Sequence, residues 1–167
     1  ELMVGRKVLL EVEKAPAKPG DVVLSVKDLR VKDDHGVERL KGVSFDIRAG
    51  EILGIAGVAG NGQSELLAAL GGMAKATGQI TMKGANLPLS GKGADGQSRR
   101  AAGIAHVPED RHKLGLVLRF PAWESAVLGY HDDAELRLGP RWSRWTGLMD
   151  HRRMRARCRR MMEAFDV

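Results

Sequence analysis

The sequence predicts an α/β fold built around a phosphate-binding loop. Short apolar segments typical of strands interleave with segments that have helical periodicity. A glycine-rich stretch, Gly57 to Ser64, follows the apolar run Ile52 to Ala56 and precedes the apolar-rich segment Leu66 to Met73. This order of strand, glycine-rich loop and helix is typical of loops whose backbone N–H groups and following helix N-terminus face a phosphate.

The glycine-rich stretch departs from the usual phosphate-loop pattern at one position. The pattern G-x-x-x-x-G-K-[ST] has a lysine before its hydroxyl residue, whereas this chain has Gln63 between Gly62 and Ser64. Taken alone, the stretch is equally compatible with a phosphate-binding loop and with an ordinary tight turn. The residues on both sides therefore have to decide between these two interpretations.

The composition is that of a globular domain with an excess of positive charge. The 167 residues are 43% hydrophobic and 29% charged, which is enough to bury one core. The sequence has no run of roughly 20 apolar residues, so membrane contact is expected only through partners. Its single cysteine, Cys158, cannot form an internal disulfide and has no metal-ligand spacing around it. The net charge of +6 is compatible with nucleic acid, an anionic membrane surface or a phosphorylated small molecule.

The beginning of the chain is expected to hold a tail and then an antiparallel pair of strands. Residues 1–20 are interpreted as a tail and linker, because they end in prolines and glycine, and the folded domain is expected over residues 21–167. Alternating apolar residues predict strands at Val22 to Val31 and Val43 to Ile47. The turn residues between these strands make the pair antiparallel.

The rest of the chain is expected to alternate between strands and helices and then to end in helices. Further strands are predicted at Ile52 to Ala56, Gly78 to Met82 and Gly103 to Val107. Helices are predicted at Leu66 to Met73, Gln97 to Ala102, Trp123 to Tyr130 and His151 to Phe165. The connecting segments are expected to be irregular, namely the glycine-rich Lys83 to Gly96, the charged turn Glu109 to Lys113 and the basic loop Arg137 to Thr146.

The last predicted helix concentrates much of the positive charge. Asp150 is its expected N-cap, and its apolar side chains share one face, namely Met154, Cys158, Met161 and Phe165. Arginines fill much of the remainder, which is compatible with contacts to nucleic-acid phosphates or with a solvated helix face. Because only 4% of the residues are aromatic, few side chains are available to stack on bases, and the solvated face is favoured.

Stretches on both sides of the loop carry a resemblance to a known family. They are Val43 to Glu51, the lysine-less Gly57 to Ser64, and Ala105 to His112. With them, residues 21–167 resemble the ATP-binding domain of an ABC transporter, in particular the second of two tandem nucleotide-binding domains in importers of simple sugars and nucleosides. Leu2 to Arg6 is similar to the end of a preceding domain of this kind. By this resemblance the chain is truncated before the signature motif, the magnesium-binding aspartate strand and the switch histidine.

The resemblance implies part of a P-loop NTPase fold of the ABC ATPase type. Its expected parts are an antiparallel β-subdomain, a partial parallel core sheet and the start of a helical subdomain. The implied cofactors are ATP and magnesium. The implied nucleotide-binding residues are Gly57, Gly60, Asn61, Gly62, Gln63, Ser64, Glu65 and Glu109. Of these, Ser64 and Glu109 are the implied magnesium ligands, and Glu109 stands where the family usually has glutamine.

The function implied by the resemblance is that of a transport ATPase at the cytoplasmic face of the cell membrane. The whole protein is expected to couple ATP hydrolysis to import of a sugar or nucleoside, with permease subunits and a second nucleotide-binding domain as partners and no nucleic acid. The segment Arg111 to Trp123 is expected to face the permease. With no catalytic residue of the family in it, the chain alone is expected to be inactive. The unfilled position in its sheet is expected to make it self-associate, swap segments or be only marginally stable. The alternatives are a basic nucleic-acid-binding module and a non-catalytic interaction or regulatory domain with a degenerate loop.

Overall fold

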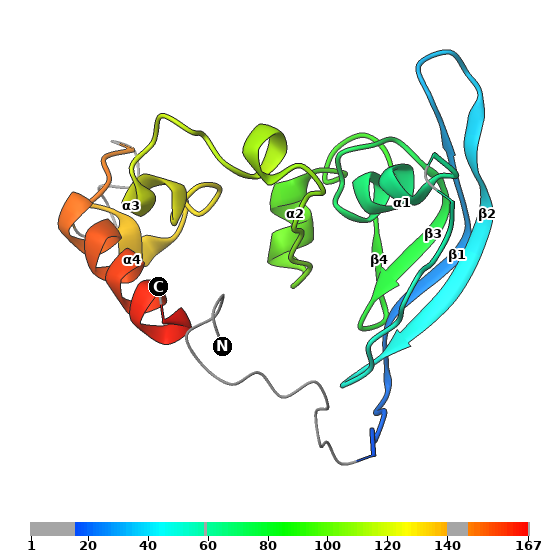
Figure 1. The fold of residues 1–167 in the computed structure, drawn as a ribbon, viewed down its shortest axis with the longest axis horizontal. Helices are drawn as coiled ribbons and strands as arrows, with labels where there is room; N and C mark the ends of the chain where they lie inside the picture. The colour runs from blue at the N-terminus through cyan, green and yellow to red at the C-terminus, as the bar shows by residue number, and fades with distance from the viewer. Residues whose placement is uncertain (1–15, 59, 140–146, 167) are drawn as a thin grey trace, which may run out of the picture. The chain divides into compact units, whose positions relative to one another are not determined.

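The computed structural model describes residues 16–58, 60–139 and 147–166. The chain divides into two compact units, of which the first ends at Ala102 and the second begins at Gly103. The segments of both units can be followed by colour in Figure 1. Most of the predicted tail and residues 140–146 of the predicted basic loop lie outside the described residues.

The first unit contains a four-stranded antiparallel sheet with the strand order β2-β1-β3-β4 (Figure 1). Its strands are β1 (Val22–Lys32), β2 (Glu38–Arg48), β3 (Thr77–Met82) and β4 (Ala85–Leu87). The predicted antiparallel start of the domain is confirmed, although β2 begins before the predicted strand. Strand β4 was missed, because it is too short to show an alternating pattern and lies in a stretch predicted to be irregular.

An irregularity in β1 turns its apolar side chains to one face of the sheet. Strict alternation from the buried Val26 would bury Asp28 and expose Leu29. The register of β1 against β2 shifts between Val26 and Leu29, and Asp28 has a φ of 46° at this point. Its backbone N–H group donates to Ser44 Oγ at 2.9 Å. The extra residue returns Leu29 and Val31 to the buried face.

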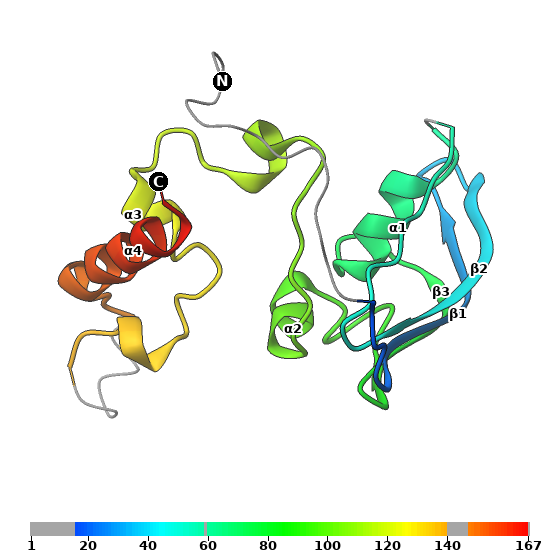
Figure 2. The same cartoon turned by 60° about the horizontal axis from the view of Figure 1, so that its bottom comes forward.

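Two helices complete the first unit, α1 (Gln63–Leu70) and α2 (Gly96–Ala101). Helix α1 contacts β1 and β2 (Figures 1 and 2). Its buried residues Leu66 and Ala69 join Leu40 of β2 in the core. Burying one aliphatic side chain of this size contributes roughly 1.5 to 3 kcal/mol, so this packing holds the start of α1 against the sheet.

Arg99 is a buried charged residue that joins α2 to the loop before it. Only 2% of it is exposed, and its Nη2 donates to the carbonyl oxygen of Pro88 at 2.5 Å. Burial lowers the pKa of Arg99, and the nearby Asp95 opposes this shift. Asp95 also caps α2, because its side chain accepts from the N–H group of Ser98 at 2.7 Å.

The expected parallel core sheet does not form in the described residues, so this part of the predicted fold class was wrong. Ile52 to Ala56 and Gly103 to Val107 are not strands, and Ile52 is 94% and Val107 76% exposed. The first segment lies in the first unit and the second in the other, and neither has a partner strand in its own unit. A strand needs a neighbour to satisfy its backbone groups and cover its side chains, which an apolar sequence alone cannot supply.

The second unit is mainly helical. Its elements are the π-helix η1 (Arg111–Gly115), α3 (Ala122–Ser125), the 3₁₀-helix η2 (Ala134–Leu136) and α4 (His151–Phe165). The helix predicted at Trp123 to Tyr130 is reduced to the single turn α3, and the residues after it form turns. The core contains Val127, Leu136 and Met154, with Trp123 and Met149 packed against them.

Helix α4 has the predicted bounds and the predicted cap. The side chain of Asp150 accepts from the N–H groups of Arg152 and Arg153 at 2.9 and 3.1 Å. Met154 and Cys158 of the predicted apolar face are buried, whereas Phe165 at the end of that face is 76% exposed. Of the helices in the described part of the chain, none is sufficiently long and apolar to span a bilayer.

We expect Leu136→Ala to destabilise the second unit by about 2 to 5 kcal/mol, because the residue is completely buried in its core. Leu138→Ala is the matched control, since Leu138 is 50% exposed and loses the same atoms. Urea unfolding of each variant, followed by far-UV circular dichroism, measures the difference. Equal losses of stability in the two variants would contradict the core described for this unit.

Candidate phosphate-binding loop

The glycine-rich loop leads directly into α1, and two of its glycines have left-handed backbone angles. Gly60 has a φ of 86°, and Gly62, the N-cap residue of α1, has a φ of 97°. A Cβ atom at Gly62 would lie 2.7 Å from the carbonyl oxygen of Arg39 in β2. Only glycine combines this backbone angle with so close an approach to a neighbouring strand. The loop therefore holds the start of α1 directly against β2.

The start of α1 offers backbone donors to an anion. The first N–H groups of any helix have no acceptor within the helix, and Gly62 has no side chain to cap them. At the start of α1 these positions include Gln63 and Glu65, at the positive end of the helix dipole. A Cβ atom at Gly60 would meet nothing within 4 Å, so the space beside the loop is open. This arrangement suits a phosphate group.

Gln63 folds back across the loop from the position where the pattern has lysine. Its amide nitrogen lies too close to the Cβ position of Gly57 for a side chain to be present there, and its Cδ lies 3.2 Å from the same point. The absence of a side chain at Gly57 therefore makes room for the amide. This amide can donate a hydrogen bond to a phosphate oxygen, but it carries no charge. From Gly57 to Glu65 the loop has no lysine or arginine and ends in an acidic residue.

A hollow of about 400 Å³ opens beside the loop in the first unit. Loop residues and the start of β2 line it, namely Gly60, Asn61, Val37, Glu38, Arg39 and Lys41. The N–H group of Val37 and the guanidinium of Arg39 hold the pKa of Asp33, in the turn before β2, below its ordinary value. Arg39 Nε donates to Asp33 Oδ2 at 2.8 Å, which fixes the guanidinium at the edge of the hollow.

The β2 residues of this hollow were missed by sequence reasoning. They carry no motif, and they meet the loop only because β2 passes the start of α1. The sequence offered one signal, namely that a loop without a lysine needs a cation from another segment. It could not show which segment, because Arg39 and Lys41 lie far from the loop along the chain. The seven loop residues from Gly57 to Glu65 that were predicted to bind the nucleotide are brought together in the first unit.

Glu109, the remaining predicted nucleotide-binding residue, belongs to the second unit. It is exposed and follows Pro108, and the π-helix η1 begins shortly after it. Asp110 caps η1 by accepting from the N–H group of Lys113 at 2.9 Å. π-Helical turns are rare and often occur at functional sites. The charged turn predicted here therefore contains a helical element, η1, and belongs to the second unit, whereas the loop belongs to the first.

The two residues predicted to bind magnesium, Ser64 and Glu109, belong to different units. Across the described ranges there is no cluster of three or more His, Cys, Asp or Glu residues that could hold a metal ion. Ser64 supplies a hydroxyl and Glu109 a carboxylate, which are hard oxygen donors. Magnesium usually binds through one or two such protein groups together with substrate phosphates and water.

The arginines of α4 are largely engaged within the second unit. Arg157 Nη1 lies 3.0 Å from Asp133 Oδ2, and Arg160 Nη2 lies 2.8 Å from Glu135 Oε1. The guanidinium of Arg155 lies 5.0 Å from the centre of the Trp123 ring. These contacts reduce the positive charge that the helix presents to a polyanion, and they favour the interpretation of α4 as a solvated, packed helix.

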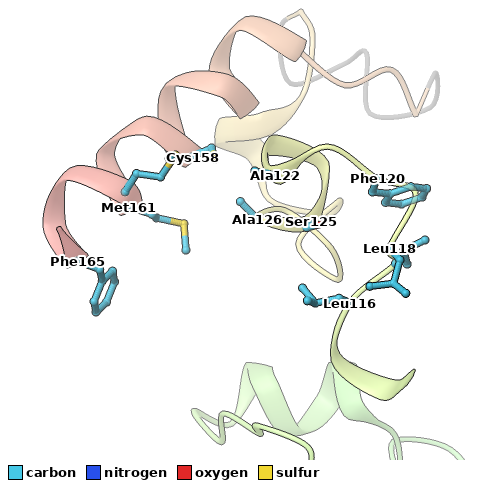
Figure 3. Close-up of a pocket in the computed structure, with 11 residues that line it drawn as sticks. Leu116, Leu118, Phe120, Ala122, Ser125, Ala126, Cys158, Met161 and Phe165 are labelled. Atoms are coloured by element: carbon cyan, nitrogen blue, oxygen red, sulfur yellow. The ribbon is translucent and has the colours of Figure 1, made fainter. Parts of the chain in front are cut away.

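The second unit also contains an apolar groove of about 690 Å³ (Figure 3). Its walls come from residues 116–120 after η1, residues 122–126 in and after α3, and residues 158–165 of α4. Figure 3 shows the side chains of Leu116, Met161 and Phe165 around this space. Large exposed apolar surfaces occur at sites for other proteins, membranes or ligands.

Comparison with known families gives a match that covers the loop and residues on both sides of it. A family model described as ABC transporter matches residues 40–165, which include the loop, α1 and all of α4. The chain belongs to the ABC transporter family. Members of the family bind ATP, and the residues matched by the family model include the lysine-less loop. A comparison with solved structures found no match.

The ABC family relatives include import proteins from bacteria and an archaeon. The chain is 41% identical to the nucleoside import ATP-binding protein NupA of Lactococcus lactis, over 100% of this chain and 31% of the relative. It is 45% identical to the guanosine import ATP-binding protein NupO of Bacillus subtilis, over 76% of this chain and 24% of the relative. The glucose import ATP-binding protein TsgD13 of Haloferax volcanii is 35% identical, over 100% of this chain and 28% of the relative. The chain thus spans less than a third of these relatives.

We expect Gly62→Ala to destabilise the first unit more than Gly84→Ala does. Both glycines have positive φ, which costs an alanine about 1 to 2 kcal/mol. At Gly84 the added methyl group meets nothing within 4 Å, whereas at Gly62 it meets the carbonyl oxygen of Arg39. Urea unfolding of both variants compares the two costs. A Gly62→Ala variant as stable as Gly84→Ala would contradict the close contact between loop and strand.

Proposed function

We propose that this chain is part of the ATP-binding component of an ABC importer for nucleosides or simple sugars. The observation that carries the proposal is the left-handed glycine loop, which presents the uncapped start of α1 beside an open hollow. The family match and the names of the relatives support it. Nucleosides are the favoured solutes, since the relatives that import nucleosides and guanosine are more similar to this chain than the glucose importer.

In this proposal the loop binds the phosphates of ATP. The backbone around Gly57, Gly60 and Gly62 approaches the phosphates, and the N–H groups at the start of α1 donate to their oxygens. The Gln63 amide provides a further, uncharged donor. Magnesium supplies charge neutralisation of the phosphates when it is bound with ATP, and the residues that would hold it are Ser64 and Glu109.

The neutral amide makes this an attenuated site. A missing charge-assisted contact weakens binding by roughly 1.5 to 3 kcal/mol, or about ten-fold to more than a hundred-fold in affinity. Hydrolysis suffers more, because a lysine also stabilises the charge that develops on the transferred phosphoryl group. We therefore assign nucleotide binding to this domain, and hydrolysis to the assembled transporter with its second nucleotide-binding domain.

The proposed partners are permease subunits, which bring the protein to the cytoplasmic face of the membrane. The segment Arg111 to Trp123 was expected to face them, and its residues 116–120 line the apolar groove of the second unit (Figure 3). An apolar segment of a permease would cover this groove. The nucleic-acid alternative is disfavoured by the internal contacts of the α4 arginines.

We expect Gln63→Lys to raise the affinity of the chain for magnesium-ATP by about ten-fold or more, because it restores a charge-assisted contact. Gln79→Lys is the matched control, since it adds the same charge at an exposed position of β3 in the same unit. Titration calorimetry at two salt concentrations measures both variants. The same gain in both variants would mean that net charge, and no defined phosphate site, attracts the nucleotide.

In the source organism, deletion of the gene is expected to abolish energised uptake of the transported solute, because the importer then has no complete ATP-binding component. Uptake of radiolabelled guanosine and of ribose, measured in the same cells, separates the two solute classes. The gene supplied on a plasmid should restore the lost activity. Unchanged uptake of nucleosides and of a panel of simple sugars would contradict the importer assignment.

A further inference from the structure

The loop lacks a cation, but the strand beside it supplies one. We propose that Lys41 of β2 makes the cationic contact to the nucleotide phosphates that the lysine makes in the pattern G-x-x-x-x-G-K-[ST]. This inference rests on the proposed binding of ATP. It assigns to a residue outside the motif the charge that Gln63 cannot carry.

Lys41 reaches the same hollow as the loop. Together with Arg39, it lines the hollow of about 400 Å³ whose other wall includes Gly60 and Asn61. The backbone of β2 is held against the loop here, because the carbonyl oxygen of Arg39 lies 2.7 Å from the Cβ position of Gly62. The hollow, the cation and the start of α1 are thus parts of one unit.

Strand β2 carries a bulge beside the loop, one residue away from Lys41, which lies opposite Arg30 in the register. The register passes from Val31 opposite Leu40 to Lys32 opposite Glu38, which leaves Arg39 as an extra residue in β2. Bulges of this kind are frequent at sheet edges and next to sites, where they redirect a side chain. Strand β2 is an edge of the four-stranded sheet, and Lys41 is exposed whereas Leu40 is buried.

Lys41 is the cation of the hollow whose charge is left for a ligand, because the other charged residues that line the hollow already have ion-pair partners. Arg39 is paired with Asp33 at 2.8 Å, and Glu38 accepts from Arg30 Nη1 at 3.1 Å. Within the described ranges, no ion pair or side-chain hydrogen bond engages the ammonium group of Lys41. A lysine is a point charge on a flexible stem of four carbons, so it can follow a phosphate at the loop.

The test compares Lys41→Gln with Lys27→Gln in titrations of the full chain with magnesium-ATP, ADP and adenosine. Lys27 is an exposed lysine of β1 that lines no wall of this hollow. We expect Lys41→Gln to weaken ATP binding about ten-fold and to leave adenosine binding unchanged, because the lost contact is with phosphate. Lys27→Gln should match the wild type for every ligand, and Lys41→Arg should retain most of the ATP affinity.

A double-mutant cycle ties the effect to the loop. In a Gln63→Lys background the loop again has its own cation, so the ten-fold effect of Lys41→Gln should shrink to about two-fold or less. Full-size effects in both backgrounds, or equal ATP affinity of Lys41→Gln and wild type, would overturn the assignment to Lys41 while leaving ATP binding intact. A wild-type chain that binds neither ATP nor ADP would instead overturn the proposed function itself. Circular dichroism of each variant confirms that it is folded.

Discussion

The close contact between Gly62 and the backbone of β2 is the constraint on which the candidate site depends. It requires a residue without Cβ in the left-handed region, because a Cβ atom at Gly62 would lie 2.7 Å from the carbonyl oxygen of Arg39. Once this contact is made, the start of α1 is fixed relative to the sheet, and Leu66 and Ala69 are directed into the core. The same contact places Lys41 beside the loop. Fold and site therefore share one physical cause.

The electrostatics of the loop follow from its sequence and are then altered by its neighbours. Between Gly57 and Glu65 the chain supplies helix-dipole and N–H donors to an anion, but its side chains add only a negative charge. An ATP molecule carries several negative charges, so such a loop alone gives weak binding. In our proposal, Lys41 of β2 changes this balance without changing the motif. The motif alone therefore does not decide whether the loop binds a nucleotide strongly or weakly, because residues outside the motif, such as Lys41, also contribute charge.

Sequence patterns predicted the local parts of this structure and failed for parts that depend on distant residues. The hairpin of β1 and β2, the loop leading into α1, and α4 with its Asp150 cap were predicted, because alternation, glycine and capping signals act within a few residues. Ile52 to Ala56 has the composition of a buried strand, yet burial and pairing are set by segments elsewhere. The role of β2 in the site was missed for the same reason.

The net charge of +6 illustrates how little a sum says about a binding surface. In α4 several arginines form ion pairs, such as Arg157 with Asp133, or lie over aromatic rings. These contacts lie within the second unit. In the first unit the pairs of Arg39 with Asp33 and of Arg30 with Glu38 cancel locally. A ligand can therefore be attracted by a cation that has no ion-pair partner among the described residues and lies near the backbone N–H groups of the loop, as Lys41 does. By that criterion a single lysine next to the glycine loop matters more than an arginine-rich helix, and the positive charge of this chain points to a nucleotide in preference to a nucleic acid.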